Sequence, residues 1–402
     1  MNPMVRKIVL ALSVVVFAYV SMGYVMGKTS DDKTYHSLTE FSEVLDHIAH
    51  DYVEDPNMHQ VSVGALHGLL DSLDPQSSYL SPAEYADYKK KLEEKGKDQI
   101  GVALSKRFGY IAVISVLPES PAAKAGLRSG DILEEIAGFT SHDMSIGQAE
   151  MLLSGEPGSS VKVTAIHRGD PHDVEVVHAK LAPPKMIEDR LQGDIAYLRV
   201  PTFEAGTANQ IRERLQQFEK QGAHKLIFDL RENAMGEIPE AISTAQFFLS
   251  SGSITTLKGQ TVSAQISTAE PSKVVWKNPM TVLISNGTAG AAEILAAAIA
   301  DNHRGDTIGE RTFGTASVQR LIPLDDGSAL ILTVANYFTP GGKSIPAEGV
   351  SPTVEVRGTI EDLTAQNEQE ENTPRPPSVD DPVTKKAVEI LQGATAQQKR
   401  AA

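Results

Sequence analysis

Residues 281–300 most constrain how this chain can fold, because three different kinds of segment follow one another without a break. Residues 281–285, Thr-Val-Leu-Ile-Ser, form an apolar run that favours a buried strand. Residues 286–293 carry two glycines, and residues 294–300 read Ile-Leu-Ala-Ala-Ala-Ile-Ala, which favours a helix. This order predicts a strand, a sharp turn and a helix. Such an elbow can expose a nucleophile and can hold an oxyanion with backbone N–H groups.

Strand and helix patterns alternate on both sides of this elbow. Apolar strand candidates lie at residues 195–200, 226–230, 282–284 and 329–334, and helix candidates at 208–221 and 238–249. Alternation of this kind predicts a multidomain α/β protein whose core has a partly parallel, mixed sheet. At 402 residues the chain is too long for one ordinary domain, so we expect several folding units.

Two motifs around the elbow resemble a known family. Residues 286–293, Asn-Gly-Thr-Ala-Gly-Ala-Ala-Glu, and residues 309–319, Gly-Glu-Arg-Thr-Phe-Gly-Thr-Ala-Ser-Val-Gln, look like the active-site region of the carboxy-terminal processing (tail-specific) serine proteases. That family uses a Ser/Lys dyad, with an elbow Gly-Ser/Thr-Ala-Ser-Ala-Ser-Glu and a lysine in Phe-Gly-Lys-Gly-Ser/Thr-Val-Gln. Aligned residue by residue, the serine falls on Gly290, the lysine on Thr315 and the residue that orients the lysine on Gln319.

The two dyad positions therefore lack the groups that the resemblance implies. A Ser/Lys dyad needs a hydroxyl that attacks and a partly desolvated amine that takes its proton, but Gly290 has no side chain and Thr315 has no basic group. We expect a catalytically degenerate relative, in which Thr288 is the candidate substitute nucleophile. Ser285 and Ser317 share the positional problem of Thr288, and neither has a Lys or His close in sequence. The alternative is an active endopeptidase that cleaves protein C-terminal tails with such a substitute.

The oxyanion region departs from the family as well. Members read Asp-Leu-Arg-x-Asn-Pro-Gly-Gly where residues 229–236 read Asp-Leu-Arg-Glu-Asn-Ala-Met-Gly. Ala234 and Met235 replace the Pro and the first Gly, and a residue with a Cβ resists positive φ. The resemblance assigns the oxyanion region to Gly236 and Ala291. Lys343, the one lysine in the closing motif of residues 337–345, follows a Pro-Gly-Gly turn, so we expect it to be solvated rather than a replacement base.

The sequence pattern changes at residue 99, and residues 99–181 are typical of a series of short strands. The stretches 111–116, 120–127, 130–133 and 160–165 resemble a PDZ domain. Such domains bind an extended peptide C-terminus by adding it to a sheet edge, with loop amides holding the carboxylate. The resemblance places this peptide-binding loop at Gln99, Ile100, Gly101 and Val102, with Gln99 in place of a glycine. Protein or peptide C-termini are thus the expected partners, and an active peptidase homologue is a further candidate partner.

Helices are predicted between residues 35 and 95. An amphipathic face repeats at helical spacing, and a cap followed by proline begins a later helix at residues 81–84; the face comprises Phe41, Val44, Leu45, Ile48 and Tyr52. Residues 72–79, Ser-Leu-Asp-Pro-Gln-Ser-Ser-Tyr, resemble another segment of the protease family. His47 and His50 lie three residues apart without an obvious third ligand, so we expect no metal there and no cofactor elsewhere.

The N-terminus predicts export. Arg6 and Lys7 precede an uncharged apolar run over residues 8–26, which is long enough to span a bilayer and has a positive flank. The positive-inside rule places the rest of the chain across the membrane. We expect a cell-envelope protein, either anchored in the membrane by this segment or periplasmic after its removal.

Composition narrows the remaining classes. A net charge of −15 and a pI near 5.2 argue against nucleic acid as a partner, and the absence of cysteine excludes disulfides and thiolate chemistry. The acidic, polar residues after 357 predict a largely disordered tail with a short helix at 381–391 and frayed residues beyond it. The expected organisation is an N-terminal signal or anchor, a helical region, a PDZ-like domain, a protease-like core and this tail, at residues 1–27, 28–97, 98–182, 183–357 and 358–402.

Overall fold

The structure is a computed structural model that describes residues 32–93, 99–142, 144–182, 184–191, 193–346, 348–357 and 381–401. The chain divides into two compact units, residues 1–65 and 66–402, and each is described by itself. In the first unit, α2 (Asp32–Asp51) carries exposed apolar side chains, among them Leu38, Phe41 and Val44. None of the helices in the ranges above is long and apolar enough to cross a membrane. The predicted signal or anchor at residues 8–26 lies outside those ranges.

The helical region continues through α3 (Met58–Asp71) to α4 (Pro82–Glu93). Ser81 and Glu84 form the cap predicted for α4, because the Ser81 N–H donates to Glu84 Oε2 at 2.8 Å and the Glu84 N–H donates to Ser81 Oγ at 3.4 Å. Burial acts to raise the pKa of Glu84, but hydrogen bonds from His67 and Ser81 outweigh it and lower that pKa to about 2. The cap therefore favours the ionised carboxylate.

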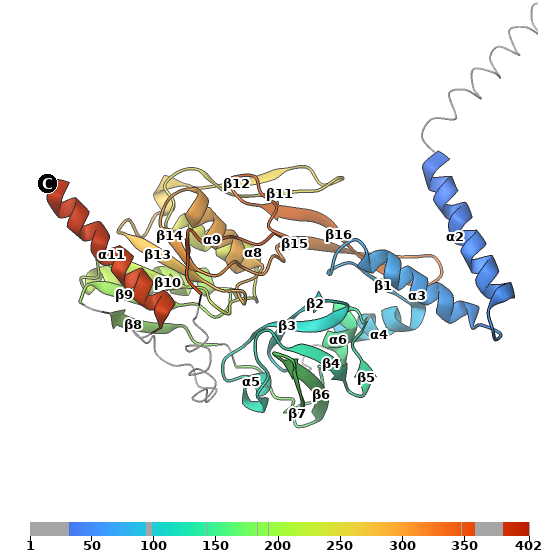
Figure 1. Ribbon diagram of the computed structural model, residues 1–402. Helices are drawn as coiled ribbons and strands as arrows, with labels where there is room; N and C mark the ends of the chain where they lie inside the picture. The colour runs from blue at the N-terminus through green and yellow to red at the C-terminus, as the bar shows by residue number, and fades with distance from the viewer. Residues whose placement is uncertain are drawn as a thin grey trace, which may run out of the picture. The chain divides into compact units, whose positions relative to one another are not determined.

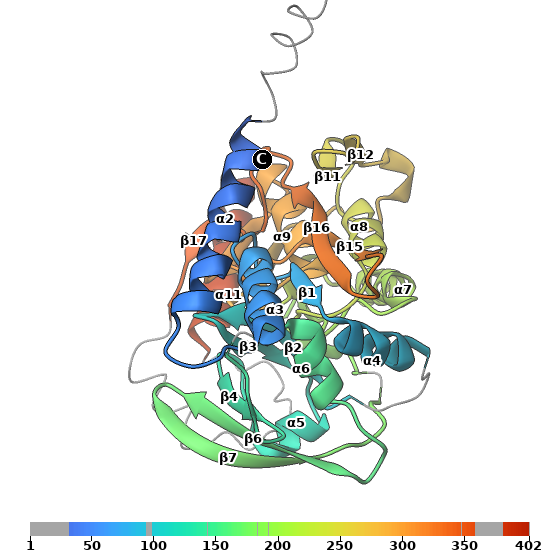
Figure 2. The same ribbon diagram turned by 90° about the vertical axis from the view of Figure 1, so that its right-hand side faces the viewer.

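One domain of the second unit is an antiparallel sheet in the order β2-β3-β4-β6-β7, with β5 paired to β4. Its strands are β2 (Val102–Arg107), β3 (Tyr110–Val116), β4 (Ile132–Ile136), β5 (Phe139–Thr140), β6 (Ser160–His167) and β7 (Asp170–Val177), and its helices are α5 (Pro121–Ala125) and α6 (Ile146–Leu152). The domain has its own buried core, to which Ile111, Leu133 and Val163 contribute. Strand β2 lies at an edge of this sheet, and both views place α6 beside it (Figures 1 and 2).

The core domain is built on a mixed sheet in the order β17-β14-β13-β10-β9-β8. Its strands are β8 (Ile187–Leu191), β9 (Ile195–Arg199), β10 (Lys225–Asp229), β13 (Met280–Ile284), β14 (Asp306–Gly309) and β17 (Val354–Glu355). All neighbours are parallel except β8, which runs antiparallel to β9. The predicted mixed-sheet α/β core is confirmed.

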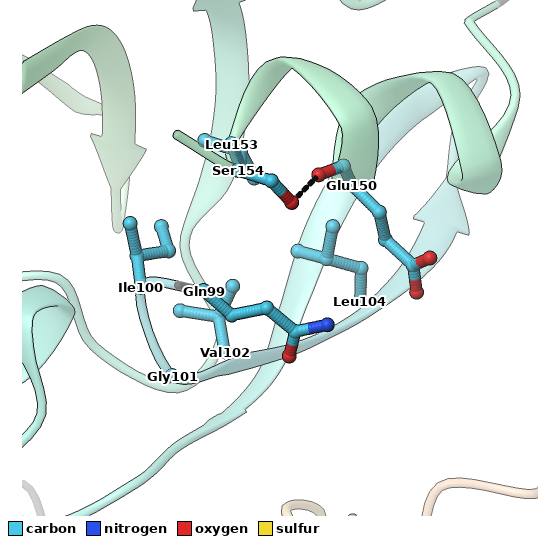
Figure 3. Close-up of a pocket in the computed structure, with 8 residues that line it drawn as sticks. All are labelled: Gln99, Ile100, Gly101, Val102, Leu104, Glu150, Leu153 and Ser154. Atoms are coloured by element: carbon cyan, nitrogen blue, oxygen red, sulfur yellow. Dashed lines mark hydrogen bonds between the residues drawn. The ribbon is translucent and has the colours of Figure 1, made fainter. Parts of the chain in front are cut away.

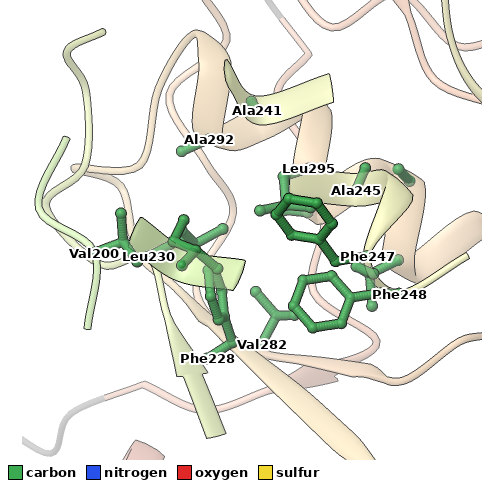
Figure 4. Close-up of a cluster of buried hydrophobic side chains, with 14 of the residues drawn as sticks. Val200, Phe228, Leu230, Ala241, Ala245, Phe247, Phe248, Val282, Ala292 and Leu295 are labelled. Carbon is green, nitrogen blue, oxygen red and sulfur yellow. The ribbon is translucent and has the colours of Figure 1, made fainter. Parts of the chain in front are cut away.

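Alternate residues of these strands face two separate hydrophobic clusters, as the period of two in a strand requires. Leu198, Phe228 and Val282 pack against α7 (Thr207–Lys220), α8 (Ile238–Gln246) and α9 (Ala291–Asp301). Figure 4 shows Phe228 and Val282 of the sheet together with Ala245 of α8 and Leu295 of α9. Tyr197 and Ile227 face the opposite side of the sheet.

A second sheet has the order β1-β16-β11-β12, with β15 paired to β16. Its strands are β1 (Ser78–Leu80), β11 (Ser253–Lys258), β12 (Gln265–Thr268), β15 (Ser317–Pro323) and β16 (Ala329–Phe338); a short 3-10 helix, η1 (Pro271–Lys273), follows β12. The strand predicted at residues 329–334 therefore belongs to this antiparallel sheet and not to the parallel one. The apolar pattern of residues 329–334 predicts a strand, but it does not predict the sheet that the strand joins or the strand with which it pairs.

The C-terminal helix α11 (Pro382–Ala401) covers the second face of the mixed sheet (Figure 1). Ala387, Val388 and Leu391 are buried against that face. The helix expected at 381–391 is thus longer than predicted, and the residues predicted to be frayed continue it to Ala401. The three apolar residues recur at helical spacing, and the helix predicted here packs them on the sheet. The predicted linker of residues 358–380 lies outside the described ranges.

An ion cluster ties the start of α11 to the core. Arg231 Nη1 donates to Asp381 Oδ2 at 2.6 Å, and Arg231 Nη2 donates to Asp229 Oδ2 at 2.7 Å. The Tyr197 hydroxyl donates to the same Asp229 oxygen at 2.6 Å. Burial acts to raise the pKa of Asp229, but Arg231 outweighs burial and lowers it. The Asp229 carboxylate is therefore ionised and paired at the end of β10, just before the turn at residues 231–236.

Candidate active site and peptide groove

The turn between β13 and α9 gives position 290 an unusual backbone conformation. Gly290 stands at the N-cap of α9 with φ 58° and ψ −115°, a combination that favours glycine. A Cβ built on Gly290 would meet no atom closer than the Thr315 hydroxyl oxygen, at 3.9 Å. The elbow thus leaves open space for a side chain at position 290, next to position 315.

The carboxylate of Glu293 fixes these two positions relative to each other. Glu293 is fully buried in the first turn of α9. Its Oε2 accepts the N–H groups of Gly290 at 2.8 Å and Thr315 at 2.9 Å, and its Oε1 accepts the Gly314 N–H at 2.7 Å and the Thr312 hydroxyl at 2.5 Å. Burial raises the pKa of Glu293 to about 7, although these four donors act to lower it. One side chain therefore binds the elbow to residues 312–315.

Gln319 lies on β15, where the resemblance placed the residue that orients a lysine. Its Nε2 donates to the Ser317 hydroxyl at 2.7 Å and to the Thr333 hydroxyl at 3.4 Å. The Thr333 hydroxyl in turn donates to Asp74 Oδ1 at 3.0 Å. Gln319 is exposed, and its amide contacts hydroxyl groups of the second sheet.

The hydroxyls considered as substitutes take part in the internal bonding of the elbow. Thr288 is buried; its Oγ1 donates to the Leu230 carbonyl at 2.8 Å and accepts the Ser285 N–H at 3.0 Å. Ser285 Oγ donates to Glu232 Oε1 at 3.0 Å and accepts the Gly287 N–H at 3.1 Å. Both hydroxyls thus hold the turn in shape, and their recorded partners in the described chain include no amine or imidazole.

The turn at residues 231–236 has one non-glycine residue in the left-handed region. That residue is Glu232, with φ 59°, whereas Ala234 and Met235 do not adopt positive φ. This agrees with the expectation that residues with a Cβ at positions 234 and 235 resist positive φ. Gly236 has φ 118°, and a Cβ there would lie 2.4 Å from the backbone of Phe203. Close packing against Phe203 requires glycine at this position.

Asn233 connects this turn to the elbow. Its carbonyl accepts the Ala289 N–H at 2.9 Å, and its Nδ2 donates to the Val200 carbonyl at 2.8 Å. The Asn233 Oδ1 atom is buried without a hydrogen-bond partner. Ala291 is the first residue of α9, where N–H groups have no partner within the helix. The two predicted oxyanion residues, Gly236 and Ala291, thus lie in segments that Asn233 and Ala289 join.

Sequence reasoning missed the roles of Glu232, Asn233 and Thr312. The capping role of Glu293 could have been recognised from the sequence, because it is a glutamate at the third position of α9. The bond from Thr312 to Glu293 could not, because nineteen residues separate them.

The other candidates lie apart from the elbow. His47 Nδ1 contacts Asp51 Oδ2 at 2.6 Å and His50 Nδ1 contacts Asp46 Oδ1 at 3.3 Å, both on the exposed surface of α2. Across the described ranges, no group of three or more His, Cys, Asp or Glu side chains is arranged to hold a metal ion. Lys343 is exposed in the turn after β16.

A groove lies between the start of β2 and the end of α6 (Figure 3). It contains all four residues of the predicted peptide-binding loop; the lining residues are Gln99, Ile100, Gly101, Val102, Leu104, Glu150, Leu153 and Ser154. The groove has a cavity volume of about 30 Å³. Leu104 follows the predicted loop on β2, whereas Glu150, Leu153 and Ser154 were not predicted, because the sequence offered no sign that residues 146–154 would lie beside β2.

The loop backbone is turned so that it can bind an extended chain. The Ala122 N–H donates to the Ile100 carbonyl at 2.9 Å, and the Leu117 N–H donates to the Gly101 carbonyl at 2.8 Å. In a trans peptide the N–H points opposite to the C=O, so the N–H groups of Gly101 and Val102 point away from these partners. Gly101 has φ 85°, and a Cβ there would lie 2.4 Å from Ser120 Cβ, so glycine is required. An edge strand with free N–H groups can accept a peptide C-terminus.

An α/β core with a strand–turn–helix elbow, joined to an antiparallel domain with an open peptide groove, defines the class of PDZ-bearing serine peptidase folds. The pattern of Peptidase family S41 matches residues 194–356, and that of the PDZ domain matches residues 113–166. The chain is 30% identical to the carboxy-terminal-processing protease of Bartonella bacilliformis over 365 residues, which cover 88% of this chain and 83% of that protein.

Two further comparisons agree with this result. The carboxy-terminal processing protease CtpA of Bacillus subtilis is 29% identical over 336 residues, covering 83% of this chain and 71% of the relative. The solved structure of a photosystem II D1 C-terminal processing protease superposes with a TM-score of 0.66 at 25% identity, covering 84% of this chain and 98% of that one. The chain belongs to the carboxy-terminal processing protease family, peptidase family S41.

Proposed function

We propose that this chain is an inactive member of its family, which binds protein C-terminal tails in the cell envelope and acts as a regulatory or scaffold protein. The observation that carries the proposal is the relation between positions 290 and 315. A side chain at 290 would point into open space beside residue 315, which is the geometry that a Ser/Lys dyad needs, yet glycine and threonine occupy the two positions.

The bonding around the elbow supports the same conclusion. Thr288 and Ser285 donate their hydroxyl protons to a carbonyl and to a carboxylate of neighbouring segments. Using either as a nucleophile would break bonds that hold the turn, and a displacement of about 1 Å already costs around a hundredfold in rate. The alternative function, an active serine-type endopeptidase that uses Thr288 as a substituted nucleophile, requires the Thr288 hydroxyl to leave its buried position.

The experiment compares the native chain with Gly290→Ser, Thr315→Lys and the double variant. Each protein is incubated with an unstructured substrate protein, and cleavage is read by mass spectrometry. We expect cleavage only from the double variant, because nucleophile and base act as a unit and each single variant lacks one of them. Cleavage by the native chain that Thr288→Ala abolishes would refute the proposal and establish the alternative.

Location and partners are part of the proposal. The apolar segment of residues 8–26 with Arg6 and Lys7 before it supports an exported protein of the cell envelope, anchored in the membrane or periplasmic. The open groove beside β2 supports peptide C-termini as ligands. An active homologue of the same family is a second candidate partner. Fractionation of cells, followed by N-terminal sequencing of the recovered chain, tests both the location and removal of the segment.

A further inference from the structure

A cavity of about 520 Å³ lies between the PDZ domain, the segment that leaves this domain, and the first strands of the core. Its fifteen lining residues come from three stretches, within residues 117–124, 179–187 and 199–201, and all of them belong to the second unit of the chain. We call this cavity the linker pocket. It shares no lining residue with the groove beside β2. Its volume is in the range of sites that enclose small molecules, and such sites are frequent where domains meet.

The linker pocket concentrates positive charge. Four cationic side chains and one acidic side chain, that of Glu119, line it; the cations are Lys124, Lys180, Lys185 and Arg199. This balance is opposite to that of the whole chain, which has a net charge of −15. The three lysines are exposed and form no ion pair with a carboxylate of the described residues, unlike Lys106, which pairs with Asp71 at 2.6 Å. Their charges are therefore available to a bound anion.

Arg199 contributes the fourth cation from the end of β9. Its register partner on β10 is Asp229, but that carboxylate is bound to Arg231 and to the Tyr197 hydroxyl. The Nε atom of Arg199 is buried and has no hydrogen-bond partner in the described part of the chain. The charge of Arg199 acts on Asp229 and Glu232 from beyond ion-pair distance. A guanidinium that lines a cavity and has no carboxylate of its own is suited to bind an acidic group.

The rest of the wall of the linker pocket is mainly apolar. Nine of the fifteen lining residues are alanine, leucine, isoleucine or proline, among them Leu117, Leu181 and Ile187. Apolar surface binds hydrocarbon because contact removes both from water. The alkyl stems of lysines extend such a surface and keep their ammonium groups in water beside it. A wall of this kind matches a ligand that has both an apolar part and an acidic part.

We propose that the linker pocket binds a single-chain anionic amphiphile, which is a molecule with one acidic head group and one apolar chain. The chain lies against Leu117, Leu181 and Ile187, and the head group is held by Arg199 and the lysines of the pocket. Carboxylates and phosphates share this chemistry, because a guanidinium binds either of them with two parallel hydrogen bonds. The bound ligand contacts both the PDZ domain and the core, because both contribute lining residues.

Isothermal titration calorimetry on the full-length chain tests the site with four probes: octanoate, octyl phosphate, octylammonium and acetate. We expect octanoate, octyl phosphate or both to bind, and the difference between them tells a carboxylate ligand from a phosphate ligand. Acetate has the head group without the chain, and octylammonium has the chain with the opposite charge, so neither should bind measurably at the same concentration. Octylammonium also measures any binding of hydrocarbon elsewhere on the chain. Equal binding of octylammonium and octanoate, or no binding of either acidic amphiphile, overturns the proposal.

Substitution of two lysines shows whether the probes bind in the linker pocket. Changing Lys124 and Lys185 together to glutamine removes two charges, and changing both to glutamate reverses them. We expect the affinity for the acidic amphiphile to decrease along this series, by about tenfold or more for the reversal, because an attraction becomes a repulsion at two positions. Added salt should weaken binding to the native chain.

The matched control reverses Lys220 and Lys277 together, because both are exposed lysines outside the pocket. This variant should keep the native affinity, and circular dichroism verifies that each variant is folded. The glutamine variant keeps the test valid if the glutamate variant does not fold. Native affinity in the glutamine and glutamate variants, or an equal loss of affinity in the control, overturns the proposal.

Discussion

At the scale of single residues, the shape of the elbow depends on the buried carboxylate of Glu293 more than on the residues at positions 290 and 315, where the family has its Ser/Lys dyad. Glu293 accepts four hydrogen bonds and connects the elbow to residues 312–315. Gly290 and Thr315 are held next to each other by these bonds, whether or not they carry catalytic groups. Glu293 is a positioning residue, because it is fully buried and its two carboxylate oxygens accept three backbone N–H groups and the Thr312 hydroxyl.

Glu293 should give stability a measurable pH dependence. Its folded-state pKa, raised by burial to about 7, lies above its ordinary value of 4.5. The folded state therefore binds a proton that the unfolded state has lost between these values, and stability decreases as the pH rises from about 4.5 to 7. We expect the advantage of the native chain over Glu293→Gln to decrease by up to about 3 kcal/mol across this window.

Urea unfolding of both proteins at several pH values between 4 and 8 measures this difference. Glu310→Gln, at an exposed glutamate of the adjacent segment, is the matched control and should run parallel to the native chain. A constant difference between the native chain and Glu293→Gln at all pH values would contradict the assignment.

At the scale of elements, the C-terminal helix is a structural part of the core. The family pattern ends at residue 356, but α11 lies beyond it and buries Ala387, Val388 and Leu391 on the sheet. Arg231 connects the first turn of α11, through Asp381, to the segment that continues into the turn beside the elbow. The helix therefore stabilises both the sheet and the strand end from which that turn begins.

Leu391→Ala tests this role of α11. Leu391 is 2% exposed, so removal of its side chain beyond Cβ should lower the free energy of unfolding by about 2–4 kcal/mol. Lys385→Ala on the exposed face of the same helix should change it by less than about 0.5 kcal/mol. Urea denaturation followed by circular dichroism measures both. Equal stability of the two variants would mean that α11 is not packed on the sheet in solution.

The sequence predicted the elements whose own residues carry a signal. The apolar run at residues 281–285 predicted β13 to within one residue at each end. The alanine-rich residues 294–300 predicted α9, which begins three residues earlier, at Ala291, and ends one residue later, at Asp301. The packing partners of each element were harder to predict, because they depend on contacts between residues far apart in sequence. Strand β16 pairs with strands of a second sheet, and α11 packs on the mixed sheet. In the groove, the loop at Gln99 to Val102 was predicted. Glu150 was not, because the contact of α6 with β2 is a tertiary contact that the local sequence does not reveal.

At the scale of the whole molecule, the PDZ domain and the peptidase-like core have separate hydrophobic clusters. Ile111, Leu133 and Val163 belong to one cluster, and Phe228 and Val282 belong to another. Domains that have separate hydrophobic cores can unfold independently of each other. Tail binding and the integrity of the peptidase-like core should therefore respond independently to substitutions.

Gly101→Ala tests this independence. A Cβ at position 101 would lie 2.4 Å from Ser120 Cβ at φ 85°, so the variant should destabilise the PDZ domain by about 1–3 kcal/mol and weaken tail binding by at least tenfold. Differential scanning calorimetry should show one transition shifted to lower temperature and the other unchanged. Gly158→Ala is the control, because Gly158 also has positive φ but no atom lies within 4 Å of the added Cβ. It measures the cost of positive φ for alanine without the steric clash that Gly101→Ala adds. A uniform shift of all transitions would show that the two cores unfold together.

The open edge of β2 also bears on self-association. An unpaired strand edge that accepts a peptide can equally accept the strand of a second copy, which is a route to aggregation. Here the strand ends in Lys106 and Arg107, and only residues 102–105 are free of charge. A short uncharged edge bounded by two cations is long enough to bind the end of a tail, but too short and too charged to template a growing sheet. We therefore expect residues 102–105 to disfavour edge-to-edge association of two copies through β2.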